Sequence, residues 1–165
     1  MAFTSGRLKL DFDFLETVTS NIGASAADAV LQHKLSLNQT VPNGTTIPVT
    51  VGGTWSLSLT SSTAYIDATA LPKANGATAD CTGLKLQAFC LKNPTGNGTI
   101  TIAHNTSTSV SAYNFIGTSG SVQVQAGGLF FWHAPEAAAD VASNAKNIIL
   151  SGTGTQSCHV AAIFG

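Results

Sequence analysis

The chain has 165 residues, a length that favours a single domain. Charged residues make up only 9% of it, against about 25% in an ordinary soluble domain. Its 21 threonines and 16 serines supply much of the polarity that charges normally provide. Binding to nucleic-acid phosphates needs lysine and arginine, and the only arginine is Arg7, so direct binding of DNA or RNA is not expected.

A surface this poor in charge is weakly protected against association. We therefore predict that other subunits cover much of it. No apolar run approaches the roughly 18 residues of a membrane span, and charges interrupt the first residues too often for a signal-peptide core. The sequence thus predicts synthesis in the cytoplasm and no membrane partner.

The first elements show the two-residue period of β-strands. Every second residue from Leu8 to Phe14 is apolar, and the residues between them are charged, which predicts a half-buried strand. We interpret residues 1–20 as an N-terminal strand or arm that contacts other subunits, and residues 21–165 as the main domain. Ser25 and Asp28 have the spacing of a helix N-cap, which allows one or two helical turns there.

Further strand signals follow along the chain. Residues 31–37 alternate again, and the runs 46–51 and 54–60, joined by Gly52-Gly53, predict a hairpin. Later runs cover residues 84–92, 99–104, 121–125, 129–133, 147–151 and 158–164, separated by turns rich in glycine, asparagine and proline. About ten short runs at this spacing predict an all-β fold, an antiparallel β-sandwich of jelly-roll type with at most one or two short helical turns.

The run Leu129–His133 (Leu-Phe-Phe-Trp-His) departs from simple alternation because both of its faces are bulky and apolar. Two explanations are open: a helix or loop covers the second face, or another subunit contacts it. We take Leu8, Phe12, Phe130 and Trp132 as candidate interface residues.

No motif indicates catalysis, since the chain has no nucleophile elbow, metalloprotease motif or phosphate-binding loop. The four histidines, His33, His104, His133 and His159, have no metal-ligand spacing, and we interpret them as hydrogen-bonded residues at the edge of the core. Three cysteines without a Cys-x-x-Cys pair favour small buried side chains over a zinc site. We expect no enzymatic activity, no cofactor and no metal.

Several short segments together resemble a known group of proteins. They are Ile66–Leu71, a loop containing Gly76, Gly83–Gln87 opening a strand that ends at Asn93, Val122–Val124 followed by Gly127-Gly128 and Pro135, Ile148–Leu150, and Ile163–Gly165. In this order they resemble small β-sandwich virion proteins of tailed bacteriophages, which serve as head-decoration, head-fibre or minor structural components. The resemblance covers roughly residues 30–165 and carries no catalytic residues.

The resemblance implies a structural component of a phage particle that decorates or cements the capsid. It implies a homo-oligomer, with a trimer favoured, whose partners are the major capsid protein or other virion proteins. Two other functions are open. One is a carbohydrate-binding or adhesin module using Trp55, Tyr65, Tyr113 or Trp132 as a stacking platform. The other is a self-assembling shell protein, which the scarcity of cationic residues disfavours.

Overall fold

The computed structural model describes residues 5–18, 29–42, 50–73, 77–103, 120–133 and 139–165. These residues fall into two compact units, one from Ser5 to Val41 and one that includes Pro42–Gly165. The described residues form β-strands, turns and bends and include no helix. The helical turns suggested near Ser25 lie outside the described residues.

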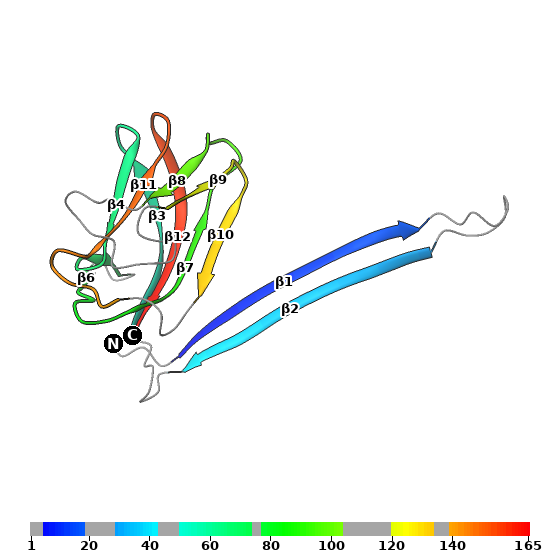
Figure 1. Cartoon of the computed structure of the whole chain (residues 1–165), viewed down its shortest axis with the longest axis horizontal. Helices are drawn as coiled ribbons and strands as arrows, with labels where there is room; N and C mark the ends of the chain where they lie inside the picture. Colours follow the sequence, from blue (N-terminus) through cyan, green and yellow to red (C-terminus); the bar gives the residue numbers. More distant parts are fainter. Residues whose placement is uncertain (1–4, 19–28, 43–49, 74–76, 104–119, 134–138) are drawn as a thin grey trace. The chain divides into compact units, whose positions relative to one another are not determined.

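The first unit is a two-stranded sheet of β1 (Ser5–Val18) and β2 (Ala29–Pro42). Figure 1 shows the two strands running antiparallel. The predicted strand around Leu8–Phe14 is therefore present, in a longer form. Among the described residues β2 pairs with β1. The expected division at residue 20 stays a prediction.

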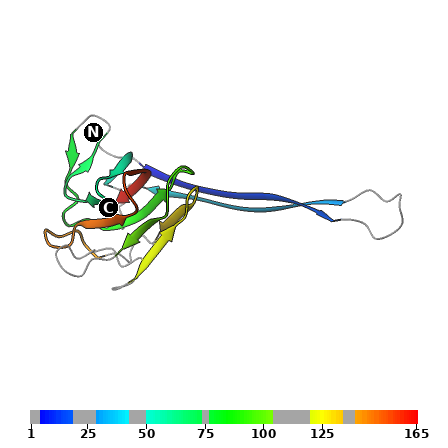
Figure 2. The same ribbon diagram turned by 90° about the horizontal axis from the view of Figure 1, so that it is seen from above.

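The second unit contains two four-stranded antiparallel sheets (Figures 1 and 2). The first sheet has the order β10 (Leu129–His133), β7 (Leu86–Lys92), β12 (Gln156–Phe164), β3 (Val51–Leu59). The second has the order β4 (Thr63–Asp67), β11 (Asn147–Ser151), β8 (Ile100–Ala103), β9 (Ser121–Val124). A short ladder joins β5 (Leu71–Pro72) to β6 (Thr78–Ala79).

The pairing of the eight main strands is nested along the chain. The first pairs with the eighth (β3 with β12), the second with the seventh (β4 with β11), the third with the sixth (β7 with β10) and the fourth with the fifth (β8 with β9). Successive strands change sheet at every step except between β8 and β9. This is the jelly-roll arrangement, so the predicted all-β antiparallel sandwich is confirmed.

The core lies between the two sheets and is almost entirely apolar. Alternate residues of each strand face inward, as a two-residue period requires. The largest fully buried apolar side chains are Leu59, Leu86, Phe89, Leu91, Ile100, Ile102, Ile148, Leu150 and Phe164.

Two turns differ from expectation. Gly52 and Gly53 do not form a hairpin turn but lie within β3, where they pair with Ile163 and Ala162 of β12. The chain does turn at Gly127, with a φ of 75°, between β9 and β10. The runs 121–125 and 129–133 on either side of this turn do not form a hairpin, however, because β9 pairs with β8 in one sheet and β10 with β7 in the other. Glycine marks a permissive backbone, but the partner of each strand is set by the core.

Candidate interaction surface

The outer face of the β10–β7–β12 region carries an unusual number of apolar side chains. Antiparallel register places Phe131 beside Cys90, and Cys90 beside Ala161. It also places His133 beside Ala88, and Ala88 beside Ile163. Directly opposed residues lie close enough for their side chains to touch. These residues and Leu129 share the outer face of the sheet, although Ala88 among them is only 3% exposed. We call this set the β10 patch: Ala88, Cys90, Leu129, Phe131, His133, Ala161 and Ile163.

Leu129 is the most exposed member of the β10 patch, with 54% of its surface accessible to solvent. It is one of only two large hydrophobic residues in the described part of the chain that are classed as exposed, the other being Tyr65 at 55%. Phe131, Cys90 and Ile163 are half-buried. A single exposed leucine is unremarkable, but neighbouring apolar side chains on one sheet face make this the candidate surface of the described residues.

The predicted interface residues on β10 occupy its opposite face. Phe130 and Trp132 are half-buried and pack against the core, and the Phe130 ring lies 6.2 Å from that of Phe89 at an angle of 52°. Their participation in an interface stays a prediction. Leu8 and Phe12 lie in β1, and their side chains are outside the described residues.

Sequence reasoning missed the outward residues Leu129 and Phe131. The run Leu129–His133 is apolar at both odd and even positions, so its pattern does not reveal which set faces the core. The pairing of Phe130 with Leu91 and of Trp132 with Phe89 decides this, because both partners are fully buried.

Two titratable side chains belong to the β10 patch, and both are kept neutral. Burial lowers the pKa of His133 below 6.5, so that its ring is uncharged at neutral pH. The Nε2 atom of His133 is buried and has no hydrogen-bond partner among the described residues. Burial also raises the pKa of the Cys90 thiol, which makes it a weak nucleophile. The patch is therefore suited to an apolar contact and lacks an activated nucleophile.

Polar residues border the β10 patch on the same sheet face. Register places the exposed Lys92 of β7 between Leu129 of β10 and His159 of β12. The Nδ1 atom of His159 lies 3.2 Å from the hydroxyl oxygen of Ser56 on β3. This serine–histidine contact is exposed, and no described carboxylate is hydrogen-bonded to the histidine, so it lacks the orienting acid of a catalytic triad.

The outer face of the second sheet has a different composition. Its outward positions alternate with the buried apolar residues and are rich in hydroxyl and amide groups: Thr63, Tyr65 and Asp67 on β4, Asn147, Ile149 and Ser151 on β11, Thr101 and Ala103 on β8, and Ser121 and Gln123 on β9. Ile149 is only 7% exposed, which leaves Tyr65 as the single exposed large hydrophobic residue on this face.

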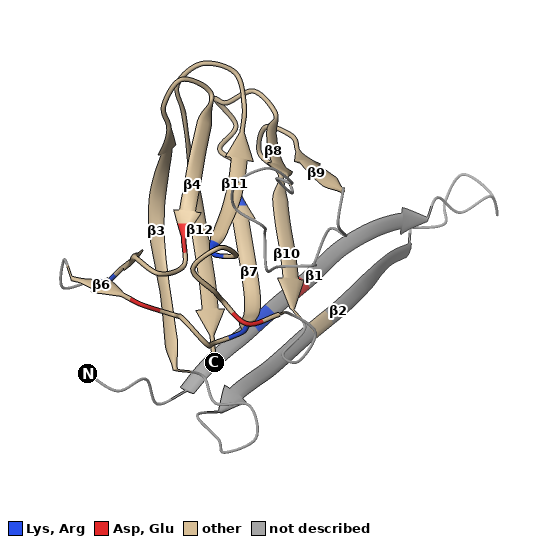
Figure 3. Ribbon diagram, turned by 60° about the vertical axis from the view of Figure 1, so that its left-hand side comes forward, with Lys and Arg blue, Asp and Glu red and all other residues tan. Residues whose placement is uncertain are grey.

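Most of the charged residues of the sandwich lie at the end nearest β6 (Figure 3). Lys146 Nζ lies 2.6 Å from Asp67 Oδ2, and Lys85 Nζ lies 2.6 Å from Asp140 Oδ1. Burial alone would raise the pKa of Asp67, but hydrogen bonds from Lys146 and Thr69 and the lysine charge outweigh it, and the pKa falls below 3.8.

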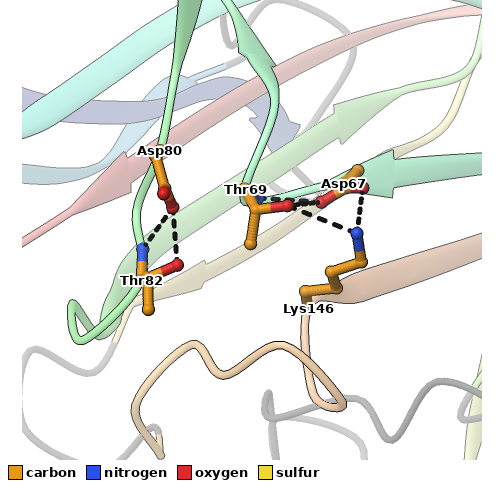
Figure 4. A network of polar contacts seen from close by, with 5 residues as sticks. All are labelled: Asp67, Thr69, Asp80, Thr82 and Lys146. Carbon is orange, nitrogen blue, oxygen red and sulfur yellow. Dashed lines mark hydrogen bonds and ion pairs between the residues drawn. The ribbon is translucent and has the colours of Figure 1, made fainter.

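Two Asp-x-Thr turns at this end have the same geometry (Figure 4). Asp67 Oδ1 accepts hydrogen bonds from the Thr69 amide at 2.8 Å and its hydroxyl at 2.6 Å. Asp80 Oδ1 accepts the equivalent bonds from Thr82 at 2.9 and 2.6 Å. The bonds to Thr82 lower the pKa of Asp80. These carboxylates close turns, and we assign them a structural role.

Within the described residues, no group of three or more histidine, cysteine or acidic side chains is arranged to hold a metal ion. The same residues contain no helix with the length and hydropathy needed to cross a bilayer. Burial raises the pKa of Cys81 to about 12 and that of Cys158 to about 11, so both thiols are inert. Of the residues considered from the sequence, His104 and Tyr113 lie outside the described residues.

No family model, no curated protein and no solved structure matches this chain. The jelly roll itself occurs in viral capsid proteins, lectins and cupins. A fold shared by such different proteins does not define a function, so the functional argument depends on the surface residues.

Proposed function

We propose that this chain is a non-enzymatic structural component of a phage particle, which decorates or cements the capsid through contacts between subunits. The observation that carries the proposal is the β10 patch. An apolar sheet face bordered by few charges resembles the buried centre of a protein interface, where charged residues are depleted and aromatic residues enriched.

The energetic role of such a surface is to favour the assembled state. Fully burying an exposed leucine or phenylalanine side chain contributes about 1.5–3 kcal/mol. A subunit that gains this burial only when it binds its neighbours shifts the equilibrium toward the intact particle. A symmetric homo-oligomer, with a trimer favoured, would repeat the contact at each subunit.

The phage particle as location is part of the proposal and comes from the sequence resemblance. The partners would be further copies of this chain and the major capsid protein or other virion proteins, after synthesis in the host cytoplasm. Direct contact with the genome is disfavoured, because lysines in the sandwich are few and two of them, Lys85 and Lys146, are ion-paired to aspartates.

Sedimentation tests the proposal, with the purified protein run alone and mixed with isolated phage heads that lack it. We expect the wild type to form a defined oligomer and to co-sediment with the heads. Leu129→Asp places a charge in the patch and should abolish both. Tyr65→Asp is the matched control, since Tyr65 is equally exposed on the other sheet, and it should sediment as the wild type does. A monomeric wild type that ignores the heads would contradict the proposal.

The second candidate function is a carbohydrate-binding module, and Tyr65 is the residue that favours it. Of the aromatic residues considered for stacking, Trp55 and Trp132 pack against the core, whereas Tyr65 is exposed among hydroxyl groups. Glycan-array binding that is lost in Tyr65→Asp and kept in Leu129→Asp would support this function over the first.

A further inference from the structure

We propose that the outer edge of β10 pairs, in antiparallel orientation, with the β10 edge of a second copy of this chain. The inference rests on the proposed function and deepens it, because it names one contact through which the copies associate. It depends on the backbone and side chains of Leu129–His133, which the structure describes in full.

The strand β10 lies at one edge of the first sheet, and its only partner among the described strands is β7 (Figure 1). Just before β10, the amide of Asn93 donates to the carbonyl oxygen of the directly opposed Gly128 at 2.9 Å. Hydrogen-bonded and non-hydrogen-bonded pairs alternate along an antiparallel ladder, so the even-numbered residues of β10 direct their backbone groups toward β7. The odd-numbered residues direct theirs away from β7: Leu129, Phe131 and His133.

The outward groups are three amides and three carbonyl oxygens, and they have no hydrogen-bond partner in the described part of the chain. An edge of this kind is a template for a further strand, and proteins normally protect it with a charge, a proline or a bulge. None of these is present in β10. Its register with β7 is regular, its five residues include no proline, and its one titratable side chain, His133, is kept neutral. The edge is therefore suited to strand addition.

The other edge strands of the described sandwich, β3, β4 and β9, are more polar. The exposed side chains of β3 and β9 are hydroxyl or amide groups, and β4 ends at the charged Asp67. In β10, by contrast, four of the five residues are large and apolar, and they project from both faces of the strand. The side chains thus distinguish β10 as the edge on which a second apolar strand fits.

Antiparallel pairing about a twofold axis at Phe131 makes β10 complementary to itself. Phe131 then lies opposite its own counterpart, and Leu129 lies opposite His133, so every outward backbone group gains a partner. Two bonds in each of three pairs give about six hydrogen bonds, within the roughly 5–15 of a typical interface. On the inner face Phe130 lies opposite Trp132, and both are half-buried in the single chain, so pairing brings aromatic side chains together.

This match is the reason for assigning a second copy as the partner. Any extended segment could form the backbone bonds, but the side chains select an uncharged strand with aromatic residues on both faces, and β10 is itself such a strand. The contact is the same patch on both copies, so it joins copies in pairs. It gives a dimer, or a hexamer where it links two of the trimers favoured above.

Disulfide trapping tests the contact and its register. Leu129→Cys and His133→Cys are made as separate proteins, each in a Cys90→Ser background, which removes the half-buried native thiol of the neighbouring strand. Opposed residues of a hydrogen-bonded pair have Cα atoms about 5.5 Å apart, within the reach of a disulfide. After mild oxidation with oxidised glutathione, an equimolar mixture should give a covalent dimer on a non-reducing gel, whereas neither variant alone should do so.

The matched control replaces one partner by a position on the opposite edge of the same sheet. Thr54 is exposed on β3, so Thr54→Cys in the same background, mixed with Leu129→Cys, should give no covalent dimer. A covalent dimer formed by Leu129→Cys alone would overturn the inference, since the proposed register keeps the two copies of Leu129 apart.

The failure of the inference and the failure of the proposed function give different results. An oligomer by sedimentation, or binding to phage heads, without any cross-link in the mixture would overturn the β10 pairing and leave the proposed function intact. A wild type that sediments as a monomer, ignores the heads and gives no cross-link in the mixture would overturn both.

A proline substitution measures the edge hydrogen bonds without cysteines. The Phe131 amide faces away from β7, so Phe131→Pro removes no bond of the β10–β7 ladder, and proline is found at such edge positions. Phe131→Ala is the matched variant, because it removes the ring and keeps the amide. We expect sedimentation to show self-association at least about tenfold weaker for Phe131→Pro than for Phe131→Ala, since the two central hydrogen bonds are lost. Equal affinities of the two variants would contradict the pairing.

Discussion

The two outer faces of the sandwich are built on the same strand geometry but carry different side chains. On the second sheet, hydroxyl and amide groups alternate with buried apolar residues, as in a sheet with one face in water. On the first sheet, Leu129, Phe131 and Ile163 face outward although their strand neighbours already fill the core. The outer face of the second sheet is polar, as an isolated molecule in water requires. The apolar outer face of the first sheet is not needed for folding and is better suited to association.

The largest expected effect contrasts the inner and outer sides of the β10–β7 pair. Phe89 is fully buried, so Phe89→Ala should cost about 3–5 kcal/mol of unfolding free energy. Phe131→Ala should change the stability of the monomer by less than about 1 kcal/mol and weaken self-association instead. Chemical denaturation and sedimentation measure the two quantities. Equal losses of monomer stability in both variants would show that Phe131 contributes to folding as much as Phe89 does.

A buried polar residue, Asn93, links the end of β7 in the first sheet to β9 in the second. It is fully buried, and its Nδ2 donates to the carbonyl oxygens of Gly98 at 2.9 Å and of Val124 at 2.8 Å. Asn93→Ala leaves the buried carbonyl oxygen of Val124 and the partly buried one of Gly98 without their donor, so we expect a loss of about 1–3 kcal/mol in urea unfolding. The control is Thr99→Ala, which removes only a solvent-exposed hydrogen bond from the half-buried Thr99 to Gln125 and should stay within about 0.5 kcal/mol of wild type.

The ion pair at the end of the sandwich should matter less. The side chains of Asp67 and Lys146 are about one-third exposed, at 34% and 31%, so solvent screens the pair. Lys146→Met should lower the unfolding free energy by about 0–1 kcal/mol, and added salt should reduce the difference. A loss of several kcal/mol in thermal or urea unfolding would show that the Asp67–Lys146 pair contributes more to the stability of the sandwich than its exposure indicates.

His133 should impose a small pH dependence on the first sheet. Burial lowers its folded-state pKa below 6.5, so the unfolded chain takes up the proton first as the pH falls. The contribution of His133 to stability is therefore complete above about pH 6.5 and declines as the pH drops below that value. Unfolding midpoints between pH 7.5 and 5.5 should fall for the wild type and fall less for His133→Gln. Identical slopes in the two proteins would show that His133 does not titrate on unfolding.

Much of the strand pattern could be predicted because it depends on local alternation. The runs at residues 147–151 and 129–133 coincide with β11 and β10, and the run from Leu8 to Phe14 lies inside β1. The failures occur where glycine was the signal. Gly52-Gly53 lies inside a strand because β12 pairs with β3 along its whole length, which local composition does not reveal.

The candidate surface was harder to predict than the strands. The sequence identified β10 as over-apolar, but it singled out Phe130 and Trp132, which pack against the core, and passed over Leu129 and Phe131. An alternating pattern specifies a face only when the two faces differ in polarity. In β10 they do not, and the buried neighbours on β7 determine which set turns inward.

By itself, the sequence determined that this chain is strand-rich, poor in charge and without a catalytic motif, since composition and two-residue periods are local properties. Only the tertiary structure decided the nested pairing of the strands and the orientation of β10. Both depend on contacts between residues far apart in the chain, and the burial of a shared core selects among pairings that local sequence leaves equivalent.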